Sequence, residues 1–138
     1  MSGEPVEERQ GGHNESVGPL PLALIVAKKG PLRDALEALL MVLEGIHQSE
    51  KVDDYATAQQ VVAHHRPVLV VLAADAPVAD TAALLRWIKV ETPGTKCLVL
   101  TQTVEQQRAL QAAGADAALL LGTSPHELSA TVERLLPR

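Results

Sequence analysis

The chain has 138 residues, which is long enough for one domain with a buried core and too short for two ordinary domains. Its formal net charge of −5, with Lys and Arg scattered along the chain, excludes the clustered basic surface that nucleic-acid binding needs. Its apolar runs fall far short of the roughly 20 residues that span a bilayer, and it holds one cysteine and no secretion signal, so we expect a cytoplasmic protein.

Residues 1–19 differ in composition from the rest of the chain. They are rich in Gly, Glu, Gln, Asn, Ser and Pro and hold almost no branched apolar side chains. Such a segment cannot bury enough apolar surface to offset the entropy lost on ordering. We therefore expect a disordered tail over 1–19 and one folded domain over 20–138.

The folded part begins with an apolar run at 22–26, which is typical of a strand buried on both faces. Pro31 suits the first turn of a helix, in which leucines recur at helical spacing from Leu32 to Leu43 on the expected inner face and Gly45 supplies the stop. The more polar stretch 46–52 predicts an edge strand, because polar side chains there oppose pairing with other chains.

A second helix is predicted to start at a cap formed by Asp53 or Asp54. Its expected inner face consists of Ala58, Val61, Val62 and His65. The following run 68–72 is the strongest strand signal in the chain and is apolar throughout, so it belongs in the middle of a sheet.

The second half of the chain repeats the alternation. Asp80 is predicted to cap a helix with Trp87 at the margin of its apolar face, and strand 97–100 follows. Thr103 and Gln106 form a capping box for a helix that stops at Gly114, and strand 117–121 comes next. The last helix has a Ser cap, Pro at its first position and Glu three residues after the cap, at 124–127.

Five strands alternating with five helices predict an α/β fold in which a parallel sheet is covered by helices on both faces. In such sheets the ligand site lies outside the carboxyl ends of the strands, where the winding reverses. This rule predicts a site lined by 27–28, 73–75, 101–102 and 121–122.

The chain resembles the receiver domains of two-component response regulators, which are CheY-like, and most closely those paired with LuxR/NarL-type output domains. The segments that carry the resemblance are 24–26, 36–40, 66–72, 76–77, 98–101, 112–116 and 124–128. The resemblance implies a flavodoxin-like, doubly wound (βα)5 fold with a five-stranded parallel sheet in the order 2-1-3-4-5, in three α/β/α layers.

The resemblance also implies a phosphorylation pocket, and this chain departs from it. The family's two metal-binding acids correspond to Ala27 and Lys28, and its phosphoacceptor aspartate corresponds to Ala73. Its lysine after the fifth strand corresponds to Leu121, and only the hydroxyl position is kept, as Thr101. We therefore expect a degenerate pseudo-receiver.

Phosphoryl transfer needs Mg²⁺, a hard cation held by oxygen ligands, often through one or two carboxylates. Lys28 instead places a positive charge where the metal would sit, and no lysine is left to stabilise the transferred group. A different flavodoxin-like enzyme is also disfavoured, because the chain has no Gly-rich phosphate loop and no paired nucleophile and base. We expect no catalytic residue, no metal and no cofactor.

Three polar residues near this pocket allow more than one interpretation. Asp75 could be a displaced nucleophile, a turn-forming residue, or the partner of Lys28 in an ion pair across the mouth of the pocket. Lys28, Lys29 and Thr101 could together bind an anion, or the two lysines could simply be solvated loop residues.

Histidine and cysteine are interpreted as structural. His64 and His65 are adjacent on a helix and point about 100° apart, so they cannot chelate one ion together. His13, His47 and His126 have no carboxylate or Cys at ligand spacing. Cys97 lies inside an apolar strand with no activating group nearby in sequence, which favours a core position.

These observations predict a phosphorylation-independent receiver-like domain that acts in signal transduction or transcriptional control through a protein partner or a second copy. In the family, the fourth helix, fifth strand and fifth helix serve partners, which here implies contacts on 104–113 and 124–136. Ala118 replaces the family's aromatic switch residue, so we expect this face to be held in one state. The alternative is a sensor that binds a small anion or metabolite at the former pocket.

Overall fold

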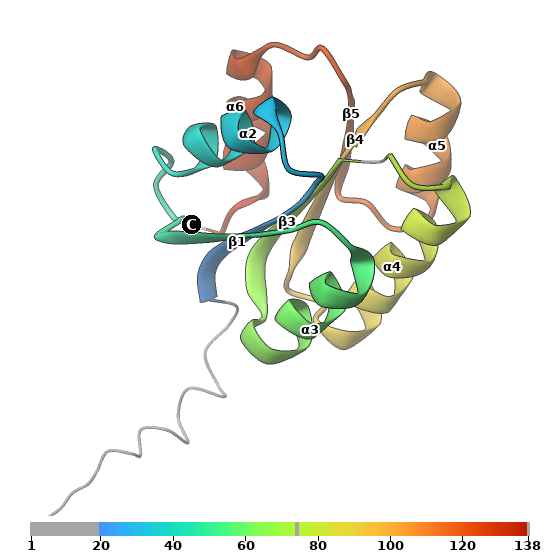
Figure 1. Ribbon diagram of the computed structural model, residues 1–138, viewed down its shortest axis with the longest axis horizontal. Helices are drawn as coiled ribbons and strands as arrows, with labels where there is room; N and C mark the ends of the chain where they lie inside the picture. Colours follow the sequence, from blue (N-terminus) through green and yellow to red (C-terminus); the bar gives the residue numbers. More distant parts are fainter. Residues whose placement is uncertain (1–19, 74, 138) are drawn as a thin grey trace, which may run out of the picture.

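The computed structural model describes residues 20–73 and 75–137, so the tail expected at 1–19 lies outside the described residues (Figure 1). Strands and helices alternate along the chain. In order they are β1 (Leu20–Val26), α2 (Pro31–Leu40), β2 (Gln48–Val52), α3 (Tyr55–His65), β3 (Pro67–Ala73), α4 (Val78–Glu91), β4 (Lys96–Thr101), α5 (Val104–Ala112), β5 (Ala117–Leu120) and α6 (Pro125–Leu135). Among the described residues, no helix is both long and apolar enough to cross a membrane.

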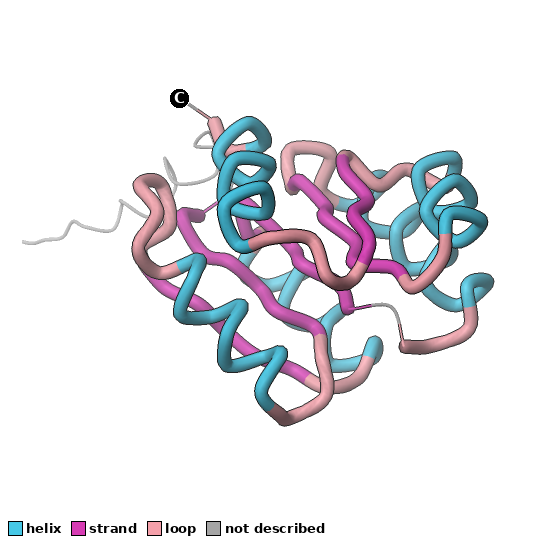
Figure 2. Tube along the Cα trace, turned by 90° about the horizontal axis from the view of Figure 1, so that it is seen from above, coloured by secondary structure: helices cyan, strands magenta, loops and turns pink. Residues whose placement is uncertain are grey.

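The five strands form one parallel sheet in the order β2-β1-β3-β4-β5, with β3 in the centre and the polar strand β2 at an edge. In register, Val26 lies opposite Leu72, Ala73 opposite Leu100, and Thr101 opposite Leu120. The carboxyl ends of the strands therefore meet at one edge. Helices cover both faces of the sheet (Figure 2), which confirms the predicted flavodoxin-like order and its three layers.

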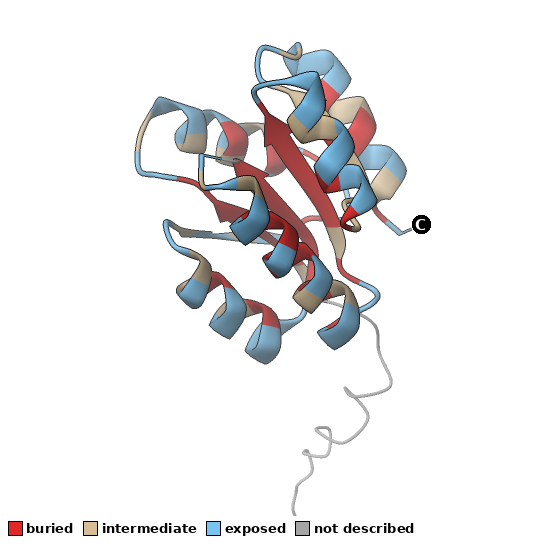
Figure 3. Cartoon of the chain, turned by 90° about the vertical axis from the view of Figure 1, so that its right-hand side faces the viewer, coloured by how far each residue is buried: buried red, intermediate tan, exposed pale blue. Residues whose placement is uncertain are grey.

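Strand β3 is buried along its whole length because its side chains alternate between two apolar clusters. Leu69 and Val71 pack in the cluster under α2 and α6, whereas Val70 and Leu72 pack in the cluster under α3, α4 and α5. Figure 3 shows the buried sheet between helices whose outer faces are exposed. This double burial explains why the sequence run at 68–72 is continuously apolar.

Three helices start at the carboxyl edge with side-chain caps, as the sequence predicts. Asp54 accepts a hydrogen bond from the Thr57 amide at 2.7 Å, which selects Asp54 over its neighbour. Thr103 and Ser124 accept from amides three residues on, each at 3.1 Å. A cap of this kind stabilises a helix by about 1 kcal/mol, so these starts are locally encoded.

Three details differ from the sequence prediction. Helix α2 ends at Leu40, and the chain reaches Gly45 through turns instead of helix. Helix α4 is preceded by Pro77, and Asp80 lies in its exposed first turn without capping it. His65, the last residue of α3, is exposed and does not belong to the inner face, and the chain leaves the helix at Arg66 with a positive φ of 46°.

The central packing leads to a stability prediction. Replacing the fully buried Leu72 by alanine should lower the free energy of unfolding by about 2 to 5 kcal/mol, because a cavity is left in the sheet–helix interface. Urea denaturation measures the loss. The matched control is Val90→Ala, whose side chain is 76% exposed on α4 and whose effect should stay within about 0.5 kcal/mol. Equal losses in the two variants would contradict the assignment of the core.

Candidate functional site

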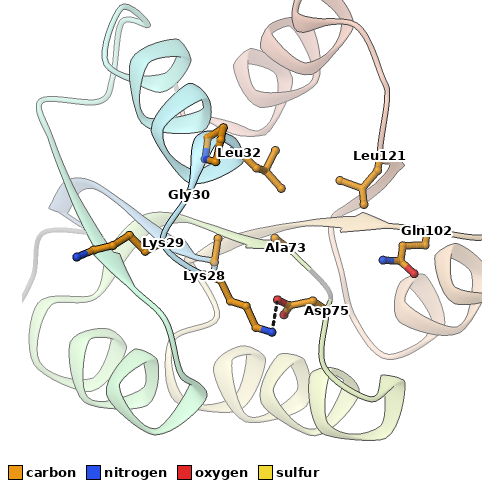
Figure 4. Close-up of a pocket in the computed structure, with 10 residues that line it drawn as sticks. Lys28, Lys29, Gly30, Leu32, Ala73, Asp75, Gln102 and Leu121 are labelled. Atoms are coloured by element: carbon orange, nitrogen blue, oxygen red, sulfur yellow. Dashed lines mark ion pairs between the residues drawn. The ribbon is translucent and has the colours of Figure 1, made fainter.

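A cavity of about 250 Å³ opens at the carboxyl edge of the sheet, between the ends of β1 and β3. This is the point where the winding of a 2-1-3-4-5 sheet reverses. The residues that line it are Ala27, Lys28, Lys29, Gly30, Pro31, Leu32, Ala73, Asp75, Gln102 and Leu121 (Figure 4). The predicted lining is thus largely assembled, although residue 74 lies outside the described residues and Thr101 and Gly122 are not part of the wall.

The floor of the cavity consists of the methyl groups of Ala27 and Ala73, both nearly buried at the ends of neighbouring strands. Strand β3 ends at Ala73, in register with Leu100, and the Asp75 amide donates to the Ala73 carbonyl at 2.9 Å. The chain therefore turns directly after the strand. Asp75 lies beyond the strand at the mouth of the cavity, which is the position of a turn residue and not of a displaced floor residue.

Lys28 and Asp75 form the ion pair that the sequence predicts across the mouth. The Lys28 Nζ to Asp75 Oδ2 distance is 3.9 Å, and the two side chains are 81% and 44% exposed (Figure 4). A long, solvated pair of this kind contributes about 0 to 1 kcal/mol at most. The pair therefore places charged groups at the rim but contributes little to holding the two side chains in fixed positions.

The three residues of the predicted anion site, Lys28, Lys29 and Thr101, do not point toward one another in the structure. The Lys29 side chain points away from Lys28 and from the cavity (Figure 4). Thr101 is fully buried beneath the edge, and its hydroxyl donates to the Leu119 carbonyl at 3.2 Å. The hydroxyl that the resemblance singled out is therefore committed to the backbone of β5.

The walls of the cavity are apolar on both sides. Leu32, at the start of α2, and Leu121, directly after β5, point toward each other and are 42% and 41% exposed. The sequence pattern assigned Leu32 to the buried face of its helix. A signal in the sequence could have placed Leu32 at the carboxyl edge instead. Leu32 directly follows Pro31, the first residue of the helix that comes after the first strand.

A polar cluster away from the cavity has a structural role. Lys89 contacts Asp116 at 2.6 Å, and the same Asp116 oxygen accepts from the Cys97 amide at 2.7 Å, so this cluster ties α4 to β4 and the start of β5. Over 20–73 and 75–137, no group of three or more His, Cys, Asp or Glu residues is placed to hold a metal ion. His13 lies outside the described residues.

No protein-family model and no curated protein matches the chain. Solved structures do match. A CheY-like response regulator receiver domain from Methanospirillum hungatei is 22% identical, with a TM-score of 0.71, 84% of this chain covered and 94% of the other. The receiver domain of a signal transduction histidine kinase from Syntrophus aciditrophicus is 24% identical, with a TM-score of 0.71 and coverages of 83% and 89%.

A pilus assembly-related protein from Burkholderia pseudomallei is 16% identical, with a TM-score of 0.69 and coverages of 83% and 87%. At such identities the likeness shows the fold alone. The structural neighbours include CheY-like receiver domains, which confirms the predicted architecture. The more specific LuxR/NarL resemblance stays a prediction.

The position of Cys97 leads to a prediction about its reactivity. Burial raises the pKa of this thiol to about 12, so at pH 8 on the order of one thiol in ten thousand is ionised. Iodoacetamide should leave the folded chain unlabelled over a period that labels the urea-unfolded chain completely, as intact mass would report. In Val90→Cys, a matched exposed position, one label should be added in the folded state. Equal labelling of folded and unfolded wild-type chain would contradict burial of Cys97.

Proposed function

We propose that this chain is a phosphorylation-independent receiver-like module that regulates by protein–protein interaction and is not an enzyme. The observation that carries the proposal is the methyl group of Ala73 on the floor of the cavity. A phosphoacceptor would have to present an oxygen there. A methyl group cannot act as a nucleophile.

The surroundings of Ala73 support the same conclusion. Ala27 offers no oxygen ligand to a hard cation from its side chain, and Lys28 brings a positive charge to the rim. Leu121 brings an apolar side chain where a cation would stabilise a transferred phosphoryl group. Three separate requirements of the reaction are therefore unmet by the residues present.

The structural neighbours support a regulatory role for this fold. Their descriptions name a response regulator receiver domain, a receiver domain of a histidine kinase and a pilus assembly-related protein. Domains of this shape thus occur in several kinds of protein. A receiver-like module without acceptor chemistry fits such a role when its surface, and not its pocket, provides the function.

We place the interaction surface on α5, β5 and α6. Strand β5 is an edge strand, and Val104 at the start of α5 is 47% exposed, so apolar surface is available on this side. Gln107 donates from its side chain to the Ala118 carbonyl at 2.6 Å and ties α5 to β5. Ala118 itself is small and buried, so no large side chain is available there to move between two positions and change the surface.

The cavity favours a second function, that of a ligand sensor. Its apolar walls do not suit the small inorganic anion that the lysines and Thr101 were expected to bind. They suit a ligand with an apolar body.

The absence of acceptor chemistry can be tested with acetyl phosphate and Mg²⁺. The intact mass of the chain should not change, whereas a receiver domain that holds all of the family's pocket residues should gain a phosphoryl group under the same conditions. Ala73→Asp should also stay unmodified, because the metal-binding acids and the lysine are still missing. A mass increase in the unsubstituted chain would overturn the proposal.

The interaction surface can be tested by self-association. We expect the dissociation constant of a dimer, measured by sedimentation velocity, to rise about tenfold or more in Val104→Asp, because a charge would be buried in the interface. Aspartate at the first helical position is compatible with the fold. The control is Val90→Asp on α4, 76% exposed, which should leave the constant unchanged. A chain that stays monomeric, or equal effects of both variants, would contradict a homodimer through this surface.

A further inference from the structure

The cavity at the carboxyl edge has room for a small organic group. An apolar cavity of about 150 Å³ is known to hold a benzene ring, and ligand pockets in general start near 300 Å³. The present cavity, at about 250 Å³, has room for a body of roughly ten heavy atoms. The two alanine methyl groups on its floor create this space, because larger side chains at Ala27 and Ala73 would fill it.

The cavity walls indicate what kind of body would fill it. Leu32 and Leu121 remain about two-fifths exposed although they point toward each other across the space. A compact apolar group placed between them would remove this surface from water, which is favourable. An inorganic anion would gain nothing from these walls, and the Thr101 hydroxyl, which was expected to help hold it, already donates to the Leu119 carbonyl.

The rim of the cavity indicates which polar group the ligand would carry. The Lys28 ammonium and the Asp75 carboxylate lie at this rim, whereas the Lys29 side chain points away from it. The Lys28 ammonium is only loosely paired, at 3.9 Å, and is well hydrated, so it can change partners at little cost. A ligand whose body lies in the cavity would bring its polar end to this rim, where a negative charge could pair with Lys28 in place of Asp75.

We propose that the cavity binds a small monocarboxylic acid, with its compact apolar body between Leu32 and Leu121 and its carboxylate paired with Lys28. This inference goes beyond the interaction role and does not depend on the surface formed by α5, β5 and α6. The carboxylate would compete with Asp75 for Lys28. Occupancy would thereby release the Asp75 carboxylate from its ion pair with Lys28.

The direct test is a titration of the full chain with benzoate, followed by amide chemical shifts in NMR. We expect saturable shifts confined to the amides around the cavity, at 27–30, 32, 73, 102 and 121. Benzyl alcohol, which has the same ring without the charge, should bind about tenfold more weakly, and inorganic phosphate should produce no saturable shift at these amides.

Three variants locate the probe. Ala73→Leu should abolish binding, because the larger side chain fills the floor of the cavity. If that variant does not fold, Leu121→Ser tests the same site at an exposed position and should weaken binding, because it removes an apolar wall. Lys28→Met should weaken benzoate about tenfold and leave benzyl alcohol unchanged. The control is Lys96→Met, because Lys96 begins β4 at the opposite edge of the sheet and cannot reach the cavity.

Several results would overturn the proposal. They are the absence of saturable benzoate shifts, benzoate shifts that persist in Ala73→Leu, and tighter binding of phosphate than of benzoate. Shifts of the same amides that depend on protein concentration, with no response to benzoate, would also overturn it and would assign the leucines to a contact between protein molecules.

Discussion

The burial of strand β3 on both faces is the constraint on which the rest of this structure depends. Its side chains alternate between two apolar clusters. A shift by one residue would move each side chain into the other cluster and disturb the close packing of both. The register with β1 and β4 then brings the end of β3 to Ala73, level with Leu100. The chemistry available at the carboxyl edge follows from that end point, because the residue placed there has a methyl group and no oxygen.

The winding of the sheet creates a crevice at this edge whatever residues line it, because the crossovers leave β1 and β3 in opposite directions. In this chain the crevice has an apolar floor and apolar walls, and charge remains only at its rim. The same geometry that could hold a cation and an anion thus forms a small apolar cavity. Changing a few side chains at strand ends changes the ligand class without disturbing the sheet that positions them.

The two proposed functions use different parts of the fold. The surface formed by α5, β5 and α6 lies beside an edge strand, where backbone and apolar side chains are accessible. The cavity lies at the switch point, and Leu121, directly after β5, belongs to its wall. A ligand in the cavity would therefore contact Leu121, which directly follows β5 of the interaction surface. This contact is a physical route by which ligand binding in the cavity could affect partner binding at the surface.

The alternation of apolar runs and capped helices was enough to predict a parallel sheet covered by helices, because continuous burial and capping are local properties. Residues 68–72 were predicted to form a central strand, and Thr103 and Ser124 to start helices. The order of the strands came from the resemblance to receiver domains. The residues at the pocket followed from the rule about strand ends, and so did the ion pair of Lys28 with Asp75. Side-chain direction could not be read in this way. The Thr101 hydroxyl donates to the neighbouring strand β5, the Lys29 side chain points away from the cavity, and Leu32 points toward Leu121 across it. The local sequence leaves several rotamers open to each of these side chains. Contacts between segments that are distant in sequence decide which rotamer is adopted.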